Sequence, residues 1–342
     1  MNHSLQTARV ECGLARIDAL EMNDVTVYRE MPATRDPVFK TWFYQRWGRE
    51  SAVISARTHR AEYPEYPQLL SIKAAFGGSE DYFIDGRRLS VDDDTFAILN
   101  HHRTYGSVID SLVPMHSFSI FFDTRLVAQV NQLIVHGPER ALDESTDERC
   151  STIEFPETLY AHDRLVSPVL RYIRDAVDAG MDDANWLNEQ FLFLLERMLR
   201  VRHNRLSLEK TIPSTKTSTR RELLKRIEYG VNFIHTRYRD TISLGDIAAA
   251  AHMSQFHFLR TFKAVYHVTP MQFLNHKRVM AAKRFLEHSE WSMSTIAAHV
   301  GLGSRTSLFR QISSAYGMSP RNLRSLATEY PRQPSPAARI KA

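Results

Sequence analysis

Residues 243–270 read S-L-G-D-I-A-A-A-A-H-M-S-Q-F-H-F-L-R-T-F-K-A-V-Y-H-V-T-P, and residues 292–320 repeat the pattern as S-M-S-T-I-A-A-H-V-G-L-G-S-R-T-S-L-F-R-Q-I-S-S-A-Y-G-M-S-P. The offset between matching residues is 49 before the turn and 50 after it, because the second copy carries one extra turn residue. Each copy reads as a helix, a tight turn and a second helix, the unit that places its second helix in the DNA major groove. A repeat of this kind decides the fold of its region.

Helix start signals recur at matching places in the two copies. Ser243 and Asp246 have capping-box spacing, and Ser254 and Ser304 stand where the second helices should begin. Each copy ends in a capping residue followed by a proline suited to the first turn of the next helix, namely Thr269-Pro270 and Ser319-Pro320. Gly301 and Gly303 supply the flexible turn within the second copy. The helix-turn-helix motifs are therefore predicted at residues 243–266 and 292–316.

The second helix of each copy carries two stripes on opposite sides. One is apolar at i, i+4, i+7 spacing and should face the core; it consists of Phe258, Phe262 and Val265, and of Leu308, Ile312 and Ala315. The other lies roughly 200° around the helix and should face outward; it consists of Phe256, Leu259, Arg260 and Lys263, and of Thr306, Phe309, Arg310 and Ser313. We predict DNA contacts from Ser254, Gln255, Phe256, Leu259, Arg260, Lys263, Ser304, Arg305, Thr306, Phe309 and Arg310.

Two interpretations stay open for the outward residues. Arg260 and Arg310 are placed to hydrogen-bond a guanine edge or a phosphate, or else they are solvated surface charges. Phe256, Leu259 and Phe309 either pack on thymine methyl groups or complete the core. A helix from Pro270 to about His288 joins the copies; its 19 residues span roughly 28 Å, against roughly 34 Å for one turn of DNA. One monomer could therefore reach adjacent major grooves.

Residues 225–325 resemble the DNA-binding domain of the AraC/XylS family of bacterial transcription regulators. The matching residues are Ile247-Ala248, Ser254, Phe258, Arg260, Phe262-Lys263, Arg278, Ala282, Leu286, Ile296-Ala297, Gly301, Arg310, Gly317 and Ser319-Pro320. The chain departs from the family pattern at Leu302, at Ile312-Ser313, and at Leu259, where many members carry a polar base-reading residue. The resemblance implies a transcription regulator, an activator, that binds promoter DNA, works with RNA polymerase, forms a homodimer and responds to a small-molecule effector.

Charge is distributed unevenly along the 342 residues. Residues 220–330 carry 16 Lys and Arg against 7 Asp and Glu, a net of +9, whereas residues 1–219 carry a net of −7. A basic domain joined to an acidic one suggests a polyanionic partner for one end only. Two cysteines allow neither a disulfide framework nor a four-cysteine zinc site, and no signal peptide or long apolar run is present. These features favour a cytoplasmic protein with no membrane partner.

The first half reads as short strands separated by turns. The strand candidates are residues 52–57, 69–76, 81–84, 96–100 and 118–122, with Asp85-Gly86 as a hairpin turn and further turns at 77–78 and 92–94. Such spacing suggests a barrel or jelly roll, and the resemblance implies a cupin-like barrel that binds the effector. Aromatic residues could line a pocket or simply fill the barrel, and Arg57 or Arg87 could pair with an acidic ligand; these aromatics are Trp42, Tyr44, Trp47, Tyr63, Tyr66, Phe76, Tyr82 and Tyr105.

The predicted fold class is therefore α+β, with several domains. Residues 1–205 form the effector-sensing and dimerisation domain, with the barrel at about 25–155 and a helical hairpin at 160–203. The hairpin stripes are Leu165, Val169, Ile173, Ala176 and Val177, and Leu187, Phe191, Leu194, Leu195 and Met198, and the hairpin either packs on the barrel or pairs with a second subunit. A linker at 206–219, an all-α DNA-binding domain at 220–330 and a disordered tail at 331–342 complete the chain.

Two enzymatic functions are alternatives to DNA binding alone. A metal-dependent cupin enzyme needs a cluster of ligands, and the candidates are His59 near Glu62, the pair His101-His102, and His116. Adjacent residues on a strand point to opposite faces, so His101 and His102 should not ligate together. A DNA-repair protein needs a supported reactive cysteine, and neither Cys12 nor Cys150 lies in a recognisable motif. We predict no enzyme activity, no cofactor and no metal.

Overall fold

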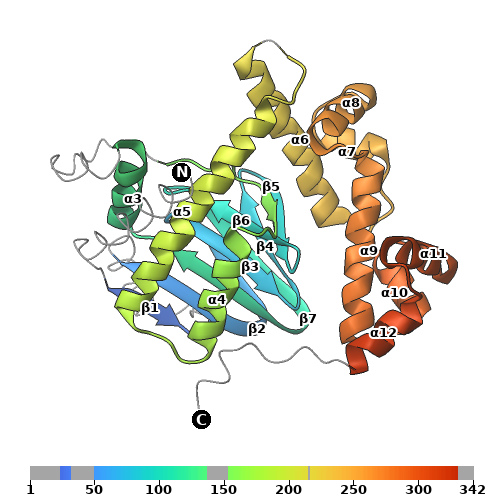
Figure 1. Ribbon diagram of the computed structural model, residues 1–342, viewed down its shortest axis with the longest axis horizontal. Helices are drawn as coiled ribbons and strands as arrows, with labels where there is room; N and C mark the ends of the chain where they lie inside the picture. The colour runs from blue at the N-terminus through green and yellow to red at the C-terminus, as the bar shows by residue number, and fades with distance from the viewer. Residues whose placement is uncertain (1–23, 32–49, 137–152, 215, 330–342) are drawn as a thin grey trace, which may run out of the picture. The chain divides into compact units, whose positions relative to one another are not determined.

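The computed structural model describes residues 24–31, 50–136, 153–214 and 216–329 (Figure 1). The predicted disordered tail, both cysteines, and Trp42, Tyr44 and Trp47 lie outside these residues. The chain divides into two compact units. The first contains the residues up to Arg202 except Arg88–Ser90, and the second contains Arg88–Ser90 and the residues from His203 on.

The first unit is built on one eight-stranded sheet. In this sheet β1 pairs with β2 in parallel, whereas β2 pairs with β7 and β3 with β6 in antiparallel fashion. The strands are β1 (Val25–Tyr28), β2 (Ser51–Pro67), β3 (Ser71–Phe76), β4 (Ser79–Ile84), β5 (Arg87–Asp92), β6 (Thr95–Leu99), β7 (Thr104–Phe121) and β8 (Leu159–Ala161). The long strand β7 pairs with β2 on one side, and with β4 and then β3 on the other. The sheet therefore curls into a nearly closed barrel, as predicted.

The five strand candidates all fall on observed strands, and the hairpin turn is confirmed. Asp85 and Gly86 adopt φ of 49° and 72° between β4 and β5, the left-handed geometry that a two-residue hairpin requires. The sequence predicted β2 only to residue 57, whereas it runs to Pro67. Its polar second half stays in the sheet because β7 continues beside it past two register shifts, at Thr58/Arg60 and Tyr63/Tyr66.

The helical hairpin packs against one face of this sheet (Figure 1). Helix α4 (Val166–Asp178) and helix α5 (Ala184–Glu209) share a core with Ile72, Phe118 and Ile120. The predicted stripe of α5 is fully buried. The predicted stripe of α4 was partly wrong, because Leu165, Val169 and Ala176 are only half-buried. The buried apolar residues of α4 are Val166, Leu170, Ile173 and Val177. Helix α3 (Thr124–His136), which the sequence analysis missed, adds Leu126 and Val130 to the same core.

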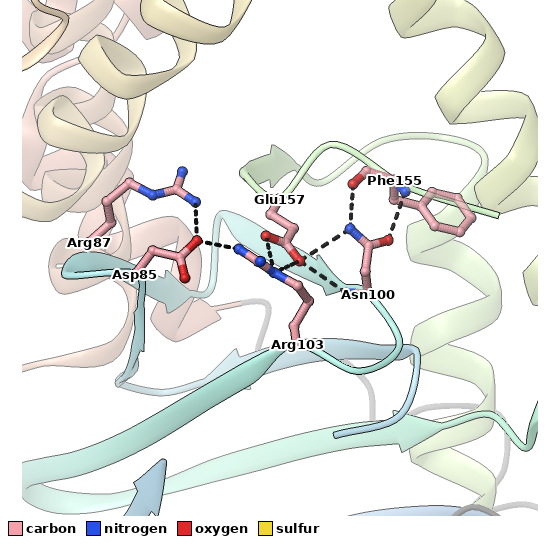
Figure 2. A network of polar contacts seen from close by, with 6 residues as sticks. All are labelled: Asp85, Arg87, Asn100, Arg103, Phe155 and Glu157. Carbon is pink, nitrogen blue, oxygen red and sulfur yellow. Dashed lines mark hydrogen bonds and ion pairs between the residues drawn. The ribbon is translucent and has the colours of Figure 1, made fainter. Parts of the chain in front are cut away.

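A polar network joins three turns of the first unit (Figure 2). Arg103 pairs with Asp85 of the β4–β5 turn and donates to Glu157 at 2.9 Å. The amide of Asn100 accepts from the Phe155 backbone N–H and donates to its carbonyl, each at 2.8 Å, as a neighbouring strand would. These contacts hold the segment that leads into β8.

The second unit is helical. Its helices are α6 (Thr217–Arg237), α7 (Leu244–Ala250), α8 (Gln255–Tyr266), α9 (Pro270–His288), α10 (Met293–His299), α11 (Arg305–Tyr316) and α12 (Pro320–Glu329). Helix α9 has the predicted bounds and contacts α7 and α8 as well as α10 and α11, so it lies between the two motifs (Figure 1). One apolar core runs through both motifs.

Half of the predicted linker belongs to the two flanking helices. Residues 206–209 end α5 and residues 217–219 begin α6, which leaves 210–216 between them. Ile212 in this short connection is buried with Leu224 of α6 and Val265 of α8. The connection is therefore anchored on the first motif rather than lying in solvent.

Candidate nucleic-acid interface

Side-chain caps begin the helices of both motifs. The hydroxyl of Ser254 accepts from the backbone N–H of His257 at 3.4 Å, and that of Ser304 accepts from Ser307 at 3.1 Å. Ser243 forms the predicted capping box with Asp246, whose pKa is lowered by the hydrogen bonds from the hydroxyl and backbone N–H of Ser243. Because each cap fixes where a helix starts, it also fixes which side chains of α8 and α11 face outward.

The inward stripes are confirmed at five of six positions. Phe258, Phe262 and Val265 of α8 are buried, as are Leu308 and Ile312 of α11, whereas Ala315 is exposed and its assignment was wrong. Its counterpart Val265 is covered by Ile212 and Leu224, from the connection and α6. Among the described residues no such cluster covers Ala315, which explains the difference.

The outward stripes face solvent as predicted. Phe256 of α8 is 76% exposed, so it does not complete the core, whereas Leu259 of α8 and Phe309 of α11 are half-buried. The remaining predicted contacts are exposed: Ser254, Gln255, Arg260, Lys263, Ser304, Arg305, Thr306 and Arg310. The structure thus brings the residues predicted on each motif together on one side of its second helix.

These two helices carry only positive formal charge. Neither Gln255–Tyr266 nor Arg305–Tyr316 contains an Asp or Glu, and the guanidinium of Arg305 lies 5.4 Å from the ring centre of Phe309. Arg260 and Arg310 are exposed; Arg260 lies one turn after Phe256, and Arg310 directly follows Phe309. An exposed helix face that combines arginine forks with apolar rings can contact phosphates, guanine edges and thymine methyl groups.

Arg278, one of the residues that carries the family resemblance, has a structural position instead. Its guanidinium donates to the backbone carbonyl of Tyr238 at 2.7 Å and to that of Asp240 at 2.6 Å. It therefore joins the spacer helix α9 to the loop after α6. Burial lowers the pKa of Arg278, and the nearby carboxylate of Asp240 raises it in part.

A basic cleft beside α11 was missed by the sequence analysis. It has a volume of about 500 Å³ and is lined by Ser292, Met293, Ser294, Arg305, Arg321, Arg324 and Ser325. Only Arg305 among these was predicted as a contact. A usable signal was present, because Arg305 and Arg321 directly follow helix start signals, where the helix dipole disfavours cations.

The inside of the barrel holds a second cluster of polar residues. Lys73 is 2% exposed, and its ammonium lies 3.6 Å from the ring centre of Phe121, with Tyr105 and Tyr82 at 5.4 and 5.8 Å. The carboxylate of Glu80 accepts from Ser117 at 2.7 Å. Burial holds the pKa of Lys73 well below its ordinary value, although the charge of Glu80 raises it in part. Of the predicted aromatic wall, Tyr82 and Tyr105 reach this cluster.

Other side chains suggested for the first unit lie elsewhere. Phe76 contacts the ring of His116 on the helix-covered face, Tyr63 is half-buried, and the side chain of Tyr66 is outside the described set. Arg57 pairs with Asp178 at 3.6 Å and Arg87 with Asp85 at 4.0 Å. Both arginines already face a carboxylate of the chain.

The histidines do not assemble as a ligand cluster. His101 and His102 lie in the turn between β6 and β7 with ring centres 3.8 Å apart, so the argument that separated them as strand neighbours was wrong. His116 is buried and hydrogen-bonds Ser55 at 2.8 Å, and His59 is exposed. Within the described ranges, no group of three or more His, Cys, Asp or Glu residues is placed to hold a metal ion. None of the helices in those ranges is long and apolar enough to span a membrane.

Comparison with known proteins places the similarity chiefly in the second unit. A family model described as a helix-turn-helix domain matches residues 247–325. The uncharacterised HTH-type transcriptional regulator YdeC of Bacillus subtilis (strain 168) is 29% identical over 101 residues, which is 29% of this chain and 35% of that protein. The regulatory protein PocR of Salmonella typhimurium is 27% identical over 111 residues, so the chain spans about a third of the length of these relatives.

A weaker match extends over most of the chain. The HTH-type transcriptional activator RhaS of Escherichia coli O157:H7 is 21% identical over 284 residues, which is 81% of this chain and 93% of that protein. Among solved structures, the DNA-binding domain of AdpA in complex with a target DNA is 27% identical. The match covers 32% of this chain and 97% of the AdpA domain, with a TM-score of 0.30.

Proposed function

We propose that the chain, whose C-terminal domain is that of the AraC/XylS family of transcription regulators, binds promoter DNA through helices α8 and α11 and regulates transcription as an activator. The observation that carries the proposal is the outward face of these helices, where Phe256, Arg260 and Arg310 are exposed opposite a buried apolar stripe. Both faces belong to one compact unit and are joined by α9.

The spacing of the motifs supports binding by a single monomer. Helix α9 has 19 residues and spans roughly 28 Å, close to the roughly 34 Å between successive major grooves on one side of the duplex. Two different reading helices on one spacer should therefore recognise an asymmetric site. On this proposal the protein works in the cytoplasm, where bacterial promoters lie.

Salt dependence tests the DNA-binding proposal. The full chain should bind duplexes selected from a randomised library, with log K falling linearly against log salt concentration by about 0.9 for each phosphate contact. The second unit carries the basic excess of the chain, so several contacts should contribute. The measurement is fluorescence anisotropy at about 50 to 200 mM salt. A flat salt response would contradict the proposal.

We further propose that a small molecule binds inside the barrel and controls the DNA-binding unit. The buried ammonium of Lys73 supports this, since it lies over three aromatic rings and interacts with the charge of Glu80. A buried ammonium is costly unless oxygen acceptors surround it, and a ligand oxygen would supply one. Homodimer formation and contact with RNA polymerase belong to the same proposal and rest on the family resemblance.

Lys73→Met should remove the response to effector while leaving DNA binding by the effector-free protein unchanged. Methionine keeps the length and apolar stem of lysine but loses the ammonium that a ligand oxygen would contact. The measurement is footprinting on the DNA that flanks the gene, with and without a cellular metabolite extract. Lys225→Met, on the exposed side of α6, controls for the lost charge. An extract response that survives Lys73→Met would contradict a role for this residue.

A further inference from the structure

The basic cleft beside α11 has a lining rich in arginine and serine. Three arginines and three serines face about 500 Å³, and its seven lining residues include no Asp or Glu. Arg321 and Arg305 are both exposed, and the guanidinium of Arg305 lies 5.4 Å from the ring centre of Phe309. Such a surface raises the local concentration of anions.

The cleft also has a fixed wall. Arg324 donates to the backbone carbonyl of Trp291 at 2.6 Å. The Trp291 ring stacks on Phe285, with ring centres 5.0 Å apart, and meets the edge of His299 at 4.9 Å. The loop that precedes Ser292 is thus tied to α9, α10 and α12, so the three arginines project from anchored elements.

The repeat provides an internal reference for these arginines. At the positions that match Arg305, Arg321 and Arg324, the first motif carries Gln255, Met271 and Leu274. Both motifs fold as the same helix arrangement, so this arrangement does not require arginine at the places of Arg305 and Arg321. Arg305 and Arg321 lie in the first turns of α11 and α12, where the helix dipole makes a cation unfavourable. A local cost that the other copy avoids points to a binding role.

We propose that this cleft contacts a backbone phosphate of the bound DNA, with Arg321 and Arg324 of α12 completing a site that Arg305 of α11 begins. The inference rests on the proposed DNA-binding function and adds a contact from outside the two reading helices. Arginine forks and serine hydroxyls are the groups that proteins use on phosphate oxygens. Because Arg305 belongs to both surfaces, the cleft continues the outward face of α11. The contact fixes the register of the second motif on the duplex and reads no base.

Arg321→Met tests the proposal, because methionine is the residue that the first motif carries at this place. The variant of the full chain is expected to lower the slope of log K against log salt by about 0.9. Between about 50 and 200 mM salt, the variant should therefore lose about 3.5-fold less affinity than the parent. Binding to selected and scrambled duplexes should weaken alike, with the base preferences unchanged. Arg321→Lys should keep the parental slope, since it keeps the charge.

Two comparisons make the result decisive. Lys225→Met removes one exposed charge from α6, outside the cleft, and should leave the slope as it is. An unchanged slope in Arg321→Met, or an equal fall in Lys225→Met, would overturn the proposal while parental DNA binding stands. A parental protein without salt dependence would instead remove the proposed function itself.

The source of the phosphate is tested separately. Inorganic phosphate is added to the DNA-free full chain at constant ionic strength, and the thermal midpoint is measured for the parent and for Arg321→Met. We expect no difference between them, because a DNA contact is supplied by the duplex. A rise in midpoint that depends on Arg321, together with an unchanged DNA salt slope, would assign the cleft to a free phosphorylated ligand and overturn the DNA contact.

Discussion

Replacing Arg260 and Arg310 together with alanine is expected to weaken binding to a selected DNA site by about 2–6 kcal/mol, since one bidentate arginine–guanine contact contributes about 1–3 kcal/mol. The two residues lie on different helices on either side of α9, so their effects should add. Each single variant should lose preference at its own base position only. The measurement is sequence preference across a randomised duplex library, read for both single variants and the double variant.

The matched variants Arg260→Lys and Arg310→Lys separate base reading from charge. Lysine keeps the positive charge but lacks the planar fork that meets two guanine acceptors, so base preference should fall while the salt slope stays. A uniform loss of affinity over all sequences in the alanine variants would show phosphate contacts instead. No loss at all would leave the arginines as solvated charges. Removal of Arg321 should change the salt slope without changing base preference. Removal of Arg260 or Arg310 should instead change base preference.

The helical unit was predictable from the sequence because its signals are local. The start of α8 at Ser254, the start of α9 at Pro270 and the burial of Phe258 all follow from capping chemistry and helical spacing within a few residues. Ala315 was misplaced because no residue in the described part of the chain covers it as Ile212 and Leu224 cover Val265. Its counterpart Val265 is covered by Ile212, a residue about 50 positions earlier in the chain.

The barrel was less predictable because its strands are defined by their partners. The second half of β2 has little apolar character and two prolines, yet it remains paired with β7 through two register shifts. The basic cleft also depends on contacts between distant residues, since Arg305 and Arg321 are 16 residues apart and come together only when α11 and α12 are packed. Lys73 likewise lies in an apolar run, and only the curled sheet brings Glu80 and Phe121 to it.

Gly301→Ala is expected to destabilise the second unit by about 3 kcal/mol, because it adds a steric clash to an unfavourable backbone angle. Gly301 has φ of 76°, and a Cβ there would lie 2.8 Å from the carbonyl oxygen of Arg239 and 2.9 Å from that of Tyr238. It would also meet Nε of Arg278 at 3.0 Å, the atom that donates to Tyr238. The substitution thus strains the link between α9 and the loop after α6.

Two nearby residues show that the contact matters more than the angle. His252 occupies the same place in the first motif with φ of 51°, so a side chain is tolerated where the space is open. Gly303 has φ of 75° and nothing within 4 Å of a Cβ position, so Gly303→Ala should lose only about 1 kcal/mol from the left-handed backbone. Hydrogen exchange of the α10 and α11 amides in the full chain measures both variants. Equal losses in Gly301→Ala and Gly303→Ala would mean that the backbone angle alone, and not the approach of the Arg239 and Tyr238 carbonyls, requires glycine in this turn.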